Sequence, residues 1–402
     1  MLTRTAAPAL SALPPVRSDS LLALIALAKA ESRPEKIDVG VGVFRNGEGR
    51  TPVLGAIKAA ERRLLEEQDS KGYLGGAGDV RFAELLRPLV LGAHAADERV
   101  AGVQAPGGTG AVYLALRLAA VANPEARVIM GVPTWPNHPA LTHGAGLEIV
   151  EYPYYDRDQT QLNFPAMMDA FGAARPGDIA LLHGCCHNPT GADLDEAGWR
   201  AVVDVVAERG LLPLIDIAYQ GFGRGLDEDA VGVRLMLDAC DEALVAQSCD
   251  KNFGMYRDRV GCFFLKTRSA ESSATAMAHV LQIAREAWSM PPDHGAAAVR
   301  TVLEDAELTA EWQAELEEMR LRIATVRERI AASDERLAFI ADQYGMFSML
   351  PLSRARVVSL RERHAVYMAD SGRFNVVGIA DEAIDRFCAA VIETMDSPPA
   401  NG

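Results

Sequence analysis

Short apolar runs alternate with amphipathic segments between about Thr51 and Asp305. Six of these runs are candidates for buried strands, namely Val128–Val132, Glu148–Tyr152, Ile179–His183, Leu212–Ile217, Leu244–Gln247 and Val260–Leu265. Helices are predicted between them at Gly110–Ala122 and at Asp195–Arg209, which opens with acidic residues. This alternation predicts an α/β fold with a doubly wound, mostly parallel sheet, whose chemistry lies at the carboxyl ends of its strands.

The pattern of apolar and charged residues changes after Asp305. A charged helical run, Leu308–Ala332, predicts a connector helix, and beyond it the pattern indicates a strand at Met346–Leu350 and helices near Ser353–His364 and Asp381–Met395. We therefore expect a second, smaller α+β domain. The expected division is an N-terminal segment, 1–48, that joins the small domain, a large α/β domain, 49–310, and the small domain, 311–402.

Composition and charge exclude several classes of partner. The chain has 402 residues, of which 49% are hydrophobic, and a formal net charge of −15, so we expect no nucleic-acid or anionic membrane partner. The apolar run Leu21–Ala28 is too short to span a bilayer, and Asp19 precedes it where a signal peptide has basic residues. Six cysteines without a CxxC pair indicate reduced thiols. We predict a cytoplasmic protein.

One cluster of residues resembles a set of metal ligands. It comprises His183, Cys185, Cys186 and His187, but four ligands within five residues cannot all turn onto one ion, and no second Cys/His pair follows at finger-like spacing. We interpret the segment as a packed strand end and predict no metal site.

Lys251 and Asp216 are the first candidates for chemistry. A lysine at a strand end is partly shielded, and desolvation lowers the pKa of an ammonium group towards the neutral amine that forms a Schiff base with an aldehyde. Asp216 follows a buried apolar run, where its carboxylate needs a cation such as a protonated pyridine nitrogen. Tyr219 is then placed to contact the phenolic oxygen of such a ring. The alternatives are a surface lysine in a turn and a helix N-cap aspartate.

Gly107–Gly110 precede the Ala-rich helix expected from Ala111, so backbone N–H groups are available there to an anion. The segment has neither the GxGxxG fingerprint nor the lysine of a Walker loop, which disfavours a nicotinamide-dependent oxidoreductase and favours a single phosphate. Ser248 and Arg259 are candidates to complete the phosphate site.

Five motifs stand in order along the chain: Pro133–His138 (PTWPNH), Cys185–Gly191 (CCHNPTG), Asp216–Phe222 (DIAYQGF), Lys251–Gly261 (KNFGMYRDRVG) and Ser371–Asn375 (SGRFN). Together they resemble the class I aspartate and aromatic amino acid aminotransferases, and the similarity is collinear from about Ile37 to Ile379. The resemblance implies pyridoxal 5'-phosphate as cofactor and a homodimer with shared active sites. It also implies ping-pong transfer of an amino group between an L-amino acid (aspartate, glutamate or aromatic) and a 2-oxo acid such as 2-oxoglutarate.

The resemblance implies a role for each matching residue. At the cofactor ring, Lys251 would be the Schiff-base lysine, Asp216 would lie at the ring nitrogen, Asn188 and Tyr219 at the ring oxygen, and Trp135 would stack on the ring. The phosphate would be surrounded by Gly108, Thr109, Ser248 and Arg259, together with Tyr73 donated by the neighbouring subunit. The substrate-binding set is Arg373 for the α-carboxylate, Arg285 of the neighbouring subunit for a side-chain carboxylate, and Gly42, Trp135 and Asn188. Leu21, Leu22 and Phe347 are expected to offer apolar walls to aromatic substrates.

The chain departs from the family pattern at a few positions. Asp250 replaces the small hydroxyl residue usual before the lysine, Cys249 replaces an aromatic or apolar residue, and Met290 stands where the family commonly has Asn. An added anion beside Lys251 is expected to raise the pKa of its ammonium group. The alternatives that remain are an aromatic-preferring aminotransferase, another pyridoxal-phosphate reaction, and a non-catalytic homologue on the same fold.

Overall fold

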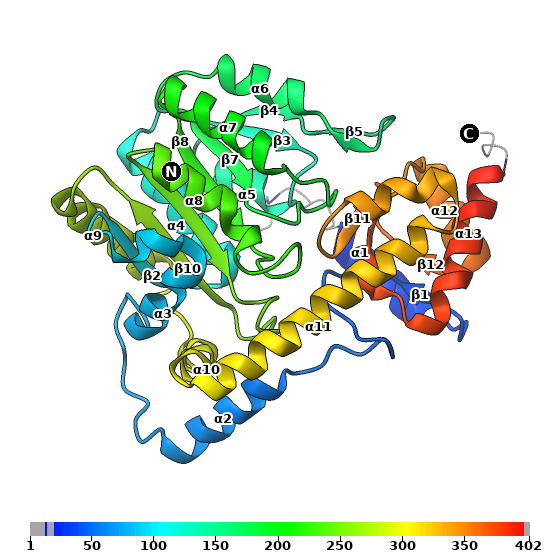
Figure 1. The fold of residues 1–402 in the computed structure, drawn as a ribbon, viewed down its shortest axis with the longest axis horizontal. Helices are drawn as coiled ribbons and strands as arrows, with labels where there is room; N and C mark the ends of the chain where they lie inside the picture. The colour runs from blue at the N-terminus through cyan, green and yellow to red at the C-terminus, as the bar shows by residue number, and fades with distance from the viewer. Residues whose placement is uncertain (1–12, 14–19, 398–402) are drawn as a thin grey trace, which may run out of the picture.

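The computed structural model describes residue 13 and residues 20–397, with side chains described from residue 23 onward apart from Leu13. A large part with a central sheet lies beside a smaller part, and the long helix α11 runs from one to the other (Figure 1). The helices are α1 Ser20–Ala30, α2 Gly55–Glu67, α3 Val80–Leu91, α4 Gly107–Ala122, α5 Asn137–Gly144, α6 Phe164–Gly172, α7 Glu196–Arg209, α8 Val231–Ala239, α9 Ala270–Ala287, α10 Asp293–Glu304, α11 Ala306–Ala331, α12 Arg354–His364 and α13 Ile384–Asp396. Short 3-10 helices are η2 Gly92–Ala96, η3 Glu228–Ala230, η4 Glu335–Asp342, η5 Val376–Gly378 and η6 Asp381–Ala383.

The central sheet has seven strands in the order β2-β10-β9-β8-β7-β3-β4. Its strands are β2 Val100–Pro106, β3 Arg127–Val132, β4 Glu148–Pro153, β7 Ile179–His183, β8 Leu212–Ile217, β9 Ala243–Ser248 and β10 Val260–Lys266. All neighbours pair in parallel except β10, which is antiparallel to both β2 and β9. The expected α/β fold with a mostly parallel sheet is confirmed.

Helices cover both faces of this sheet. Side chains alternate along a strand, so in β8 Leu214 packs with the apolar residues of α4 and α9, while Ile215 and Ile217 pack with those of α7 and α8 on the other face. A strand buried on both faces reads as a continuous apolar run, which is why β7, β8 and β9 were visible in the sequence. Ligands of such a sheet bind beyond the carboxyl ends of its parallel strands.

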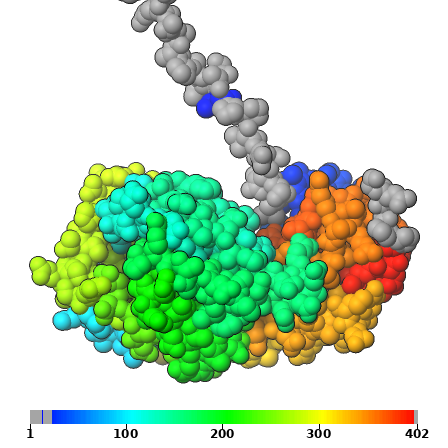
Figure 2. Space-filling view, turned by 90° about the horizontal axis from the view of Figure 1, so that it is seen from above, coloured from blue at the N-terminus to red at the C-terminus, as the bar shows by residue number. Residues whose placement is uncertain are grey.

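Residues from both ends of the chain form the smaller part. In it β1 (Ile37–Asp38) pairs in parallel with β12 (Val366–Tyr367), and β11 (Phe347–Met349) pairs antiparallel with β13 (Arg373–Asn375). The two parts touch one another, as the space-filling view shows (Figure 2): Arg157, in the hairpin of β5 (Tyr155–Asp156) and β6 (Gln161–Leu162), donates hydrogen bonds to the carbonyl oxygens of Leu352 and Ser371. The division at residues 48 and 310 stays a prediction.

The sequence pattern missed β2 and placed the start of α4 too late. β2 reads VAGVQAP, in which Gly102, Gln104 and Pro106 interrupt the apolar pattern. β2 is stabilised as a strand by pairing with β10 over seven residues, although its own sequence has no regular apolar pattern. The helix then begins at Gly107 and not at Gly110, so the glycines form its first turn.

Within residues 20–397 no helix is both long enough and apolar enough to cross a lipid bilayer.

Candidate functional site

A cavity lies at the carboxyl ends of the parallel strands. Its lining comes from the ends of β2, β3, β7, β8 and β9 and from the start of β10, which reaches the same edge because it runs antiparallel. The lining residues are Gly108, Thr109, Trp135, His183, Cys185, Asn188, Asp216, Ala218, Tyr219, Asp250, Lys251 and Arg259. Tertiary structure thus brings together residues from six separate stretches of the chain.

Lys251 follows β9 by three residues and is half-buried, with its Nζ 5.2 Å from the centre of the Tyr219 ring. Desolvation lowers the pKa of Lys251, while the neighbouring Asp250 and Asp216 carboxylates raise it and Arg259 lowers it. The net direction is downward. Asp250 therefore acts in the expected direction, but burial outweighs it, and the neutral amine is favoured more than in an exposed lysine.

Asp216 lies in β8 and is 6% exposed. Its Oδ2 is 3.1 Å from Nε2 of His138, whereas its Oδ1 is buried and receives no hydrogen bond from any described residue. Oδ1 of Asn188, in the same cavity, is also buried without a partner among them. Buried polar atoms without partners are costly, so both atoms favour a polar ligand in the cavity.

His138 is the site residue that sequence reasoning missed. It is fully buried in α5, and its Nδ1 is 2.8 Å from Oγ1 of Thr134, which in turn is 3.0 Å from Nε2 of His183. The motif Pro133–His138 was recognised, but no role was given to its last residue. The available signal was chemical: a carboxylate at the end of a buried strand needs a partner, and a histidine in a neighbouring motif can provide one.

The segment His183–His187 is packed into the sheet edge. The His187 ring stacks on Tyr154 with ring centres 3.8 Å apart, and its Nδ1 is 2.8 Å from Oγ1 of Thr190. Desolvation lowers the pKa of His183 to about 3 and lowers that of His187 well below its usual value. Both rings are therefore neutral around pH 7.

Cys185, Cys186 and Asp229 are the group of potential metal ligands that lie close together in the described part of the chain. Burial raises the pKa of the Cys186 thiol to about 12 and raises that of the Cys185 thiol well above its usual value. The Asp229 carboxylate already accepts hydrogen bonds from the backbone N–H groups of three residues, Gly221, Gly223 and Arg224. Protonated thiols and a carboxylate occupied by the backbone do not favour a metal ion.

The phosphate-site candidates meet in one corner of the cavity. Gly107, with φ of +67°, begins α4 directly after β2, and Gly108 lies so close to Ser248 that a Cβ at this position would be 3.2 Å from the Cβ of Ser248. The Arg259 guanidinium lies in the same corner, where its Nη1 forms an ion pair with Asp250. Free backbone N–H groups, a hydroxyl and a guanidinium are the donors that bind a phosphate group.

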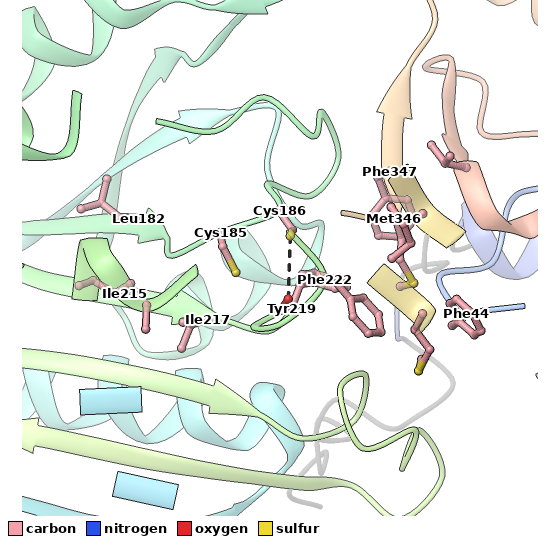
Figure 3. Close-up of a cluster of buried hydrophobic side chains, with 14 of the residues drawn as sticks. Phe44, Leu182, Cys185, Cys186, Ile215, Ile217, Tyr219, Phe222, Met346 and Phe347 are labelled. Carbon is pink, nitrogen blue, oxygen red and sulfur yellow. Dashed lines mark hydrogen bonds between the residues drawn. The ribbon is translucent and has the colours of Figure 1, made fainter. Parts of the chain in front are cut away.

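Arg373 approaches the cavity from the smaller part. Its Nη2 donates to the carbonyl oxygen of Gly40 (2.8 Å), and its guanidinium carbon lies 4.9 Å from the centre of the Phe347 ring. Phe347 and Tyr219 both belong to the buried cluster drawn in Figure 3. Their rings stand edge-on with centres 6.1 Å apart, and a Cβ on Gly42 would lie 2.7 Å from the Phe347 ring. Gly42 therefore leaves room for this ring. The Nε of Arg373 is buried without a partner among the described residues.

The family model described as aminotransferase class I and II matches residues 34–391. The chain belongs to this family. It is 50% identical to the tyrosine aminotransferase of Rhizobium meliloti (strain 1021) over 366 residues, which are 90% of this chain and 94% of that protein. It is 40% identical to the aspartate aminotransferase of Escherichia coli (strain K12) over 400 residues, 97% and 99% of the two chains.

Solved structures give the same result. The aromatic amino acid aminotransferase of Burkholderia pseudomallei, described as covalently bound to pyridoxal phosphate, superimposes with a TM-score of 0.93 at 39% identity and covers 96% of this chain and 99% of that chain. The chain is thus an aminotransferase of the pyridoxal-phosphate-dependent class I family, whose substrates are small molecules.

Two predicted site residues of this aminotransferase lie exposed on its surface. Tyr73 is 95% exposed, and Arg285 is exposed in the last turn of α9, where its Nη1 donates to Oγ of Ser289 (3.2 Å). The segments that carry them are neighbours, because the backbone N–H of Leu74 donates to Sδ of Met290 (3.2 Å). Neither side chain reaches the cavity of its own chain. Leu21 and Leu22, the expected apolar walls, have side chains outside the described residues.

Proposed function

We propose that this aminotransferase binds pyridoxal 5'-phosphate in the cavity beside Lys251. It then moves the amino group between an L-amino acid (aspartate, glutamate or aromatic) and a 2-oxo acid such as 2-oxoglutarate. One observation carries the proposal. A lysine of lowered pKa shares a polar cavity with Asp216, whose Oδ1 lacks a partner among residues 20–397. An amine nucleophile and an anion for a ring nitrogen are the two groups that this cofactor requires of a protein.

The donors and acceptors of the cavity fit the parts of the cofactor. Asp216, held by His138, would pair with the ring nitrogen, and Asn188 and Tyr219 would contact the ring oxygen beside Trp135. The proposed phosphate ligands are Gly108, Thr109, Ser248, Arg259 and Tyr73 of the partner subunit. When bound, the cofactor supplies an aldehyde for amines and an electron-withdrawing ring that stabilises negative charge on the substrate Cα.

Lys251 has two proposed tasks. Its neutral amine would hold the cofactor in the resting enzyme and, when freed by the substrate amine, would take the proton from the substrate Cα. Burial supports both tasks, because it lowers the pKa of Lys251 and so increases the fraction of free amine near pH 7.

The substrate would be held by two arginines. Arg373 is proposed to bind the α-carboxylate, since two planar N–H groups match a carboxylate and its Nε is available. Gly42, Trp135 and Asn188 complete the proposed substrate site. Arg285 of the partner subunit would bind the side-chain carboxylate of aspartate or glutamate.

Aromatic preference is the second candidate function. The chain is 50% identical to a protein named tyrosine aminotransferase, and the Phe347 ring offers an apolar surface next to Arg373.

Three further points belong to the proposal for this aminotransferase. It would form a homodimer with shared active sites, its domains would divide at residues 48 and 310, and it would be located in the cytoplasm.

An absorbance spectrum of the purified enzyme tests the cofactor and the reaction together. We expect a visible band that disappears when an amino-acid donor is added and returns with a 2-oxo acid. A Lys251→Ala variant should fold and retain phosphate-dependent cofactor binding but show no turnover, because only the nucleophile and proton carrier is lost. Wild-type turnover by this variant would contradict the assignment of Lys251.

A further inference from the structure

Asp250 places a carboxylate among the proposed phosphate donors. The residue is 1% exposed; its Oδ1 accepts a hydrogen bond from the backbone N–H of Val260 (3.0 Å), and its Oδ2 forms the ion pair with Arg259. A Cβ built on Gly107 would lie 2.8 Å from Oδ2 of Asp250 and 2.5 Å from Nη2 of Arg259. The ion pair therefore lies against the first residue of α4.

This carboxylate and a bound phosphate would compete for the same donors. Arg259 is the arginine proposed to bind the phosphate in this corner of the cavity, and its Nη1 already forms an ion pair with Asp250. A phosphate group held there adds a second anion to a site from which Asp250 cannot swing into water, since its side chain is 2% exposed and tied to Val260. A phosphate and the Asp250 carboxylate that share the Arg259 guanidinium repel one another, and burial already disfavours the ionised form of Asp250.

We propose that Asp250 takes up a proton from solvent when a phosphate group binds beside Arg259, so that this enzyme holds its cofactor less tightly as the pH rises. The inference rests on the proposed function, which places the cofactor phosphate in this corner. The neutral carboxyl group then donates its O–H instead of repelling the phosphate, and Arg259 pairs with the phosphate. Asp250 thereby becomes a determinant of cofactor affinity.

The groups around Asp250 set the direction of the pH dependence. Burial raises the pKa of Asp250, while the cations Lys251 and Arg259 lower it; the other titratable groups that face it are the Tyr256 phenol and the Cys249 thiol, both kept neutral by burial. A bound phosphate raises the pKa of Asp250 further. The affinity for the phosphate group is therefore highest at pH values below the pKa that Asp250 has in the free enzyme. It falls as the pH rises, until the pH exceeds the pKa that Asp250 has in the complex.

Calorimetric titration of the cofactor-free enzyme tests this. Inorganic phosphate and, separately, pyridoxal 5'-phosphate are added to the wild type, to Asp250→Asn and to Asp204→Asn between about pH 6 and about pH 9. Asp204 is exposed in α7, so its variant controls for the loss of one charge. Buffers with different heats of ionisation give the number of protons taken up on binding. Denaturant unfolding verifies that each variant folds.

We expect Asp250→Asn to bind both probes at least about tenfold more tightly than the wild type near the upper pH limit, because a rise of one in the pKa of Asp250 corresponds to tenfold in affinity. The difference should shrink as the pH falls, and the wild type should take up more protons than Asp250→Asn. Asp204→Asn should behave as the wild type. Equal affinities and equal proton uptake in all three proteins, or tighter binding by Asp250→Asn without a difference in proton uptake, would overturn the inference. If neither probe binds to any of them, the proposed cofactor itself is wrong.

Discussion

Lys251 and Asp216 share a cavity, but different features of their surroundings prepare them for chemistry. For Lys251 the main feature is burial, which lowers its pKa against the opposing influence of two carboxylates. Asp216 is instead fixed by a hydrogen bond, because His138 contacts Oδ2 and leaves Oδ1 free to face a ligand. A histidine locked between an aspartate and Thr134 has little freedom, so the carboxylate is held in one orientation.

Replacement of Arg285 by Ala tests how the substrate side chain is read. We expect kcat/KM for aspartate to fall about tenfold or more, because a charged bidentate hydrogen bond is lost, while that for phenylalanine stays close to the wild type. Steady-state kinetics with both donors measures the change. Arg200→Ala, an exposed arginine in α7, is the control and should affect neither. Equal losses for both donors would show that Arg285 supports the fold or the dimer and does not read the substrate.

The buried histidines predict a pH-dependent stability. His183 and His187 are neutral in the folded chain because burial lowers their pKa, to about 3 for His183, whereas an unfolded histidine titrates near about 6.5. Below that pH the unfolded chain binds protons that the folded chain does not, so the free energy of unfolding should fall as the pH is lowered from about 6.5 towards about 3.

Urea unfolding of His187→Gln at a series of pH values measures this contribution. The variant should lose less stability than the wild type over the same interval of decreasing pH, since one histidine fewer takes up a proton on unfolding. His279→Gln, which replaces an exposed histidine of α9, should show the wild-type slope. A His187→Gln slope indistinguishable from that of the wild type would refute the prediction.

At the scale of elements, α11 holds the loop that positions Phe347. Arg327, in this helix, is 2% exposed and donates to the carbonyl oxygens of Ile340, Tyr344, Gly345 and Phe347 at 2.5 to 3.1 Å. Desolvation lowers its pKa to about 10. One buried guanidinium thus connects the helix to the segment that enters β11, and through it to the ring beneath Arg373.

We therefore expect Arg327→Lys to lower the free energy of unfolding by roughly 2–5 kcal/mol, because an ammonium group cannot replace the fork of donors and leaves buried carbonyl oxygens without partners. Denaturant unfolding monitored by fluorescence gives the value. Arg329→Lys, two residues further along α11, changes an exposed ion pair with Asp385 and should stay within about 0.5 kcal/mol of the wild type. Similar losses in the two variants would show that the hydrogen bonds of Arg327 contribute little.

At the scale of the whole molecule, the proposed site is incomplete in one chain. Tyr73 and Arg285 lie on adjacent exposed segments away from the cavity of their own chain. A twofold-symmetric dimer presents the same surface of each subunit to the other, so one interface could bring both side chains to the partner's cavity. Such a dimer would account for the exposure of Tyr73 in the single chain.

Subunit exchange tests the shared site. Lys251→Ala and Arg285→Ala, each impaired with aspartate as donor, should regain activity when mixed and allowed to exchange. In the hybrid dimer one cavity has Lys251 of one chain and Arg285 of the other. With random exchange we expect recovery of up to about a quarter of the wild-type activity. No recovery, with exchange demonstrated by mass spectrometry, would show that each site is built from one chain.

The sequence by itself determined the fold class and the chemical inventory. β7 and β8 could be recognised as apolar runs, because a strand that is buried on both faces has apolar side chains at nearly every position. Lys251, Asp216 and Asn188 were identified because their motifs are local and stand in a fixed order along the chain. Residue type and order are properties of the chain alone.

Only the tertiary structure decided the direction of β10, the existence of β2 and the partners inside the site. β2 forms because β10 pairs with it, and the contact between His138 and Asp216 joins segments 78 residues apart. In the same way, the ion pair of Asp250 with Arg259 and its burial appear only once the sheet edge and α4 are assembled. Pairing, burial and the resulting pKa shifts depend on which distant segments pack together, and no local pattern of residues specifies that.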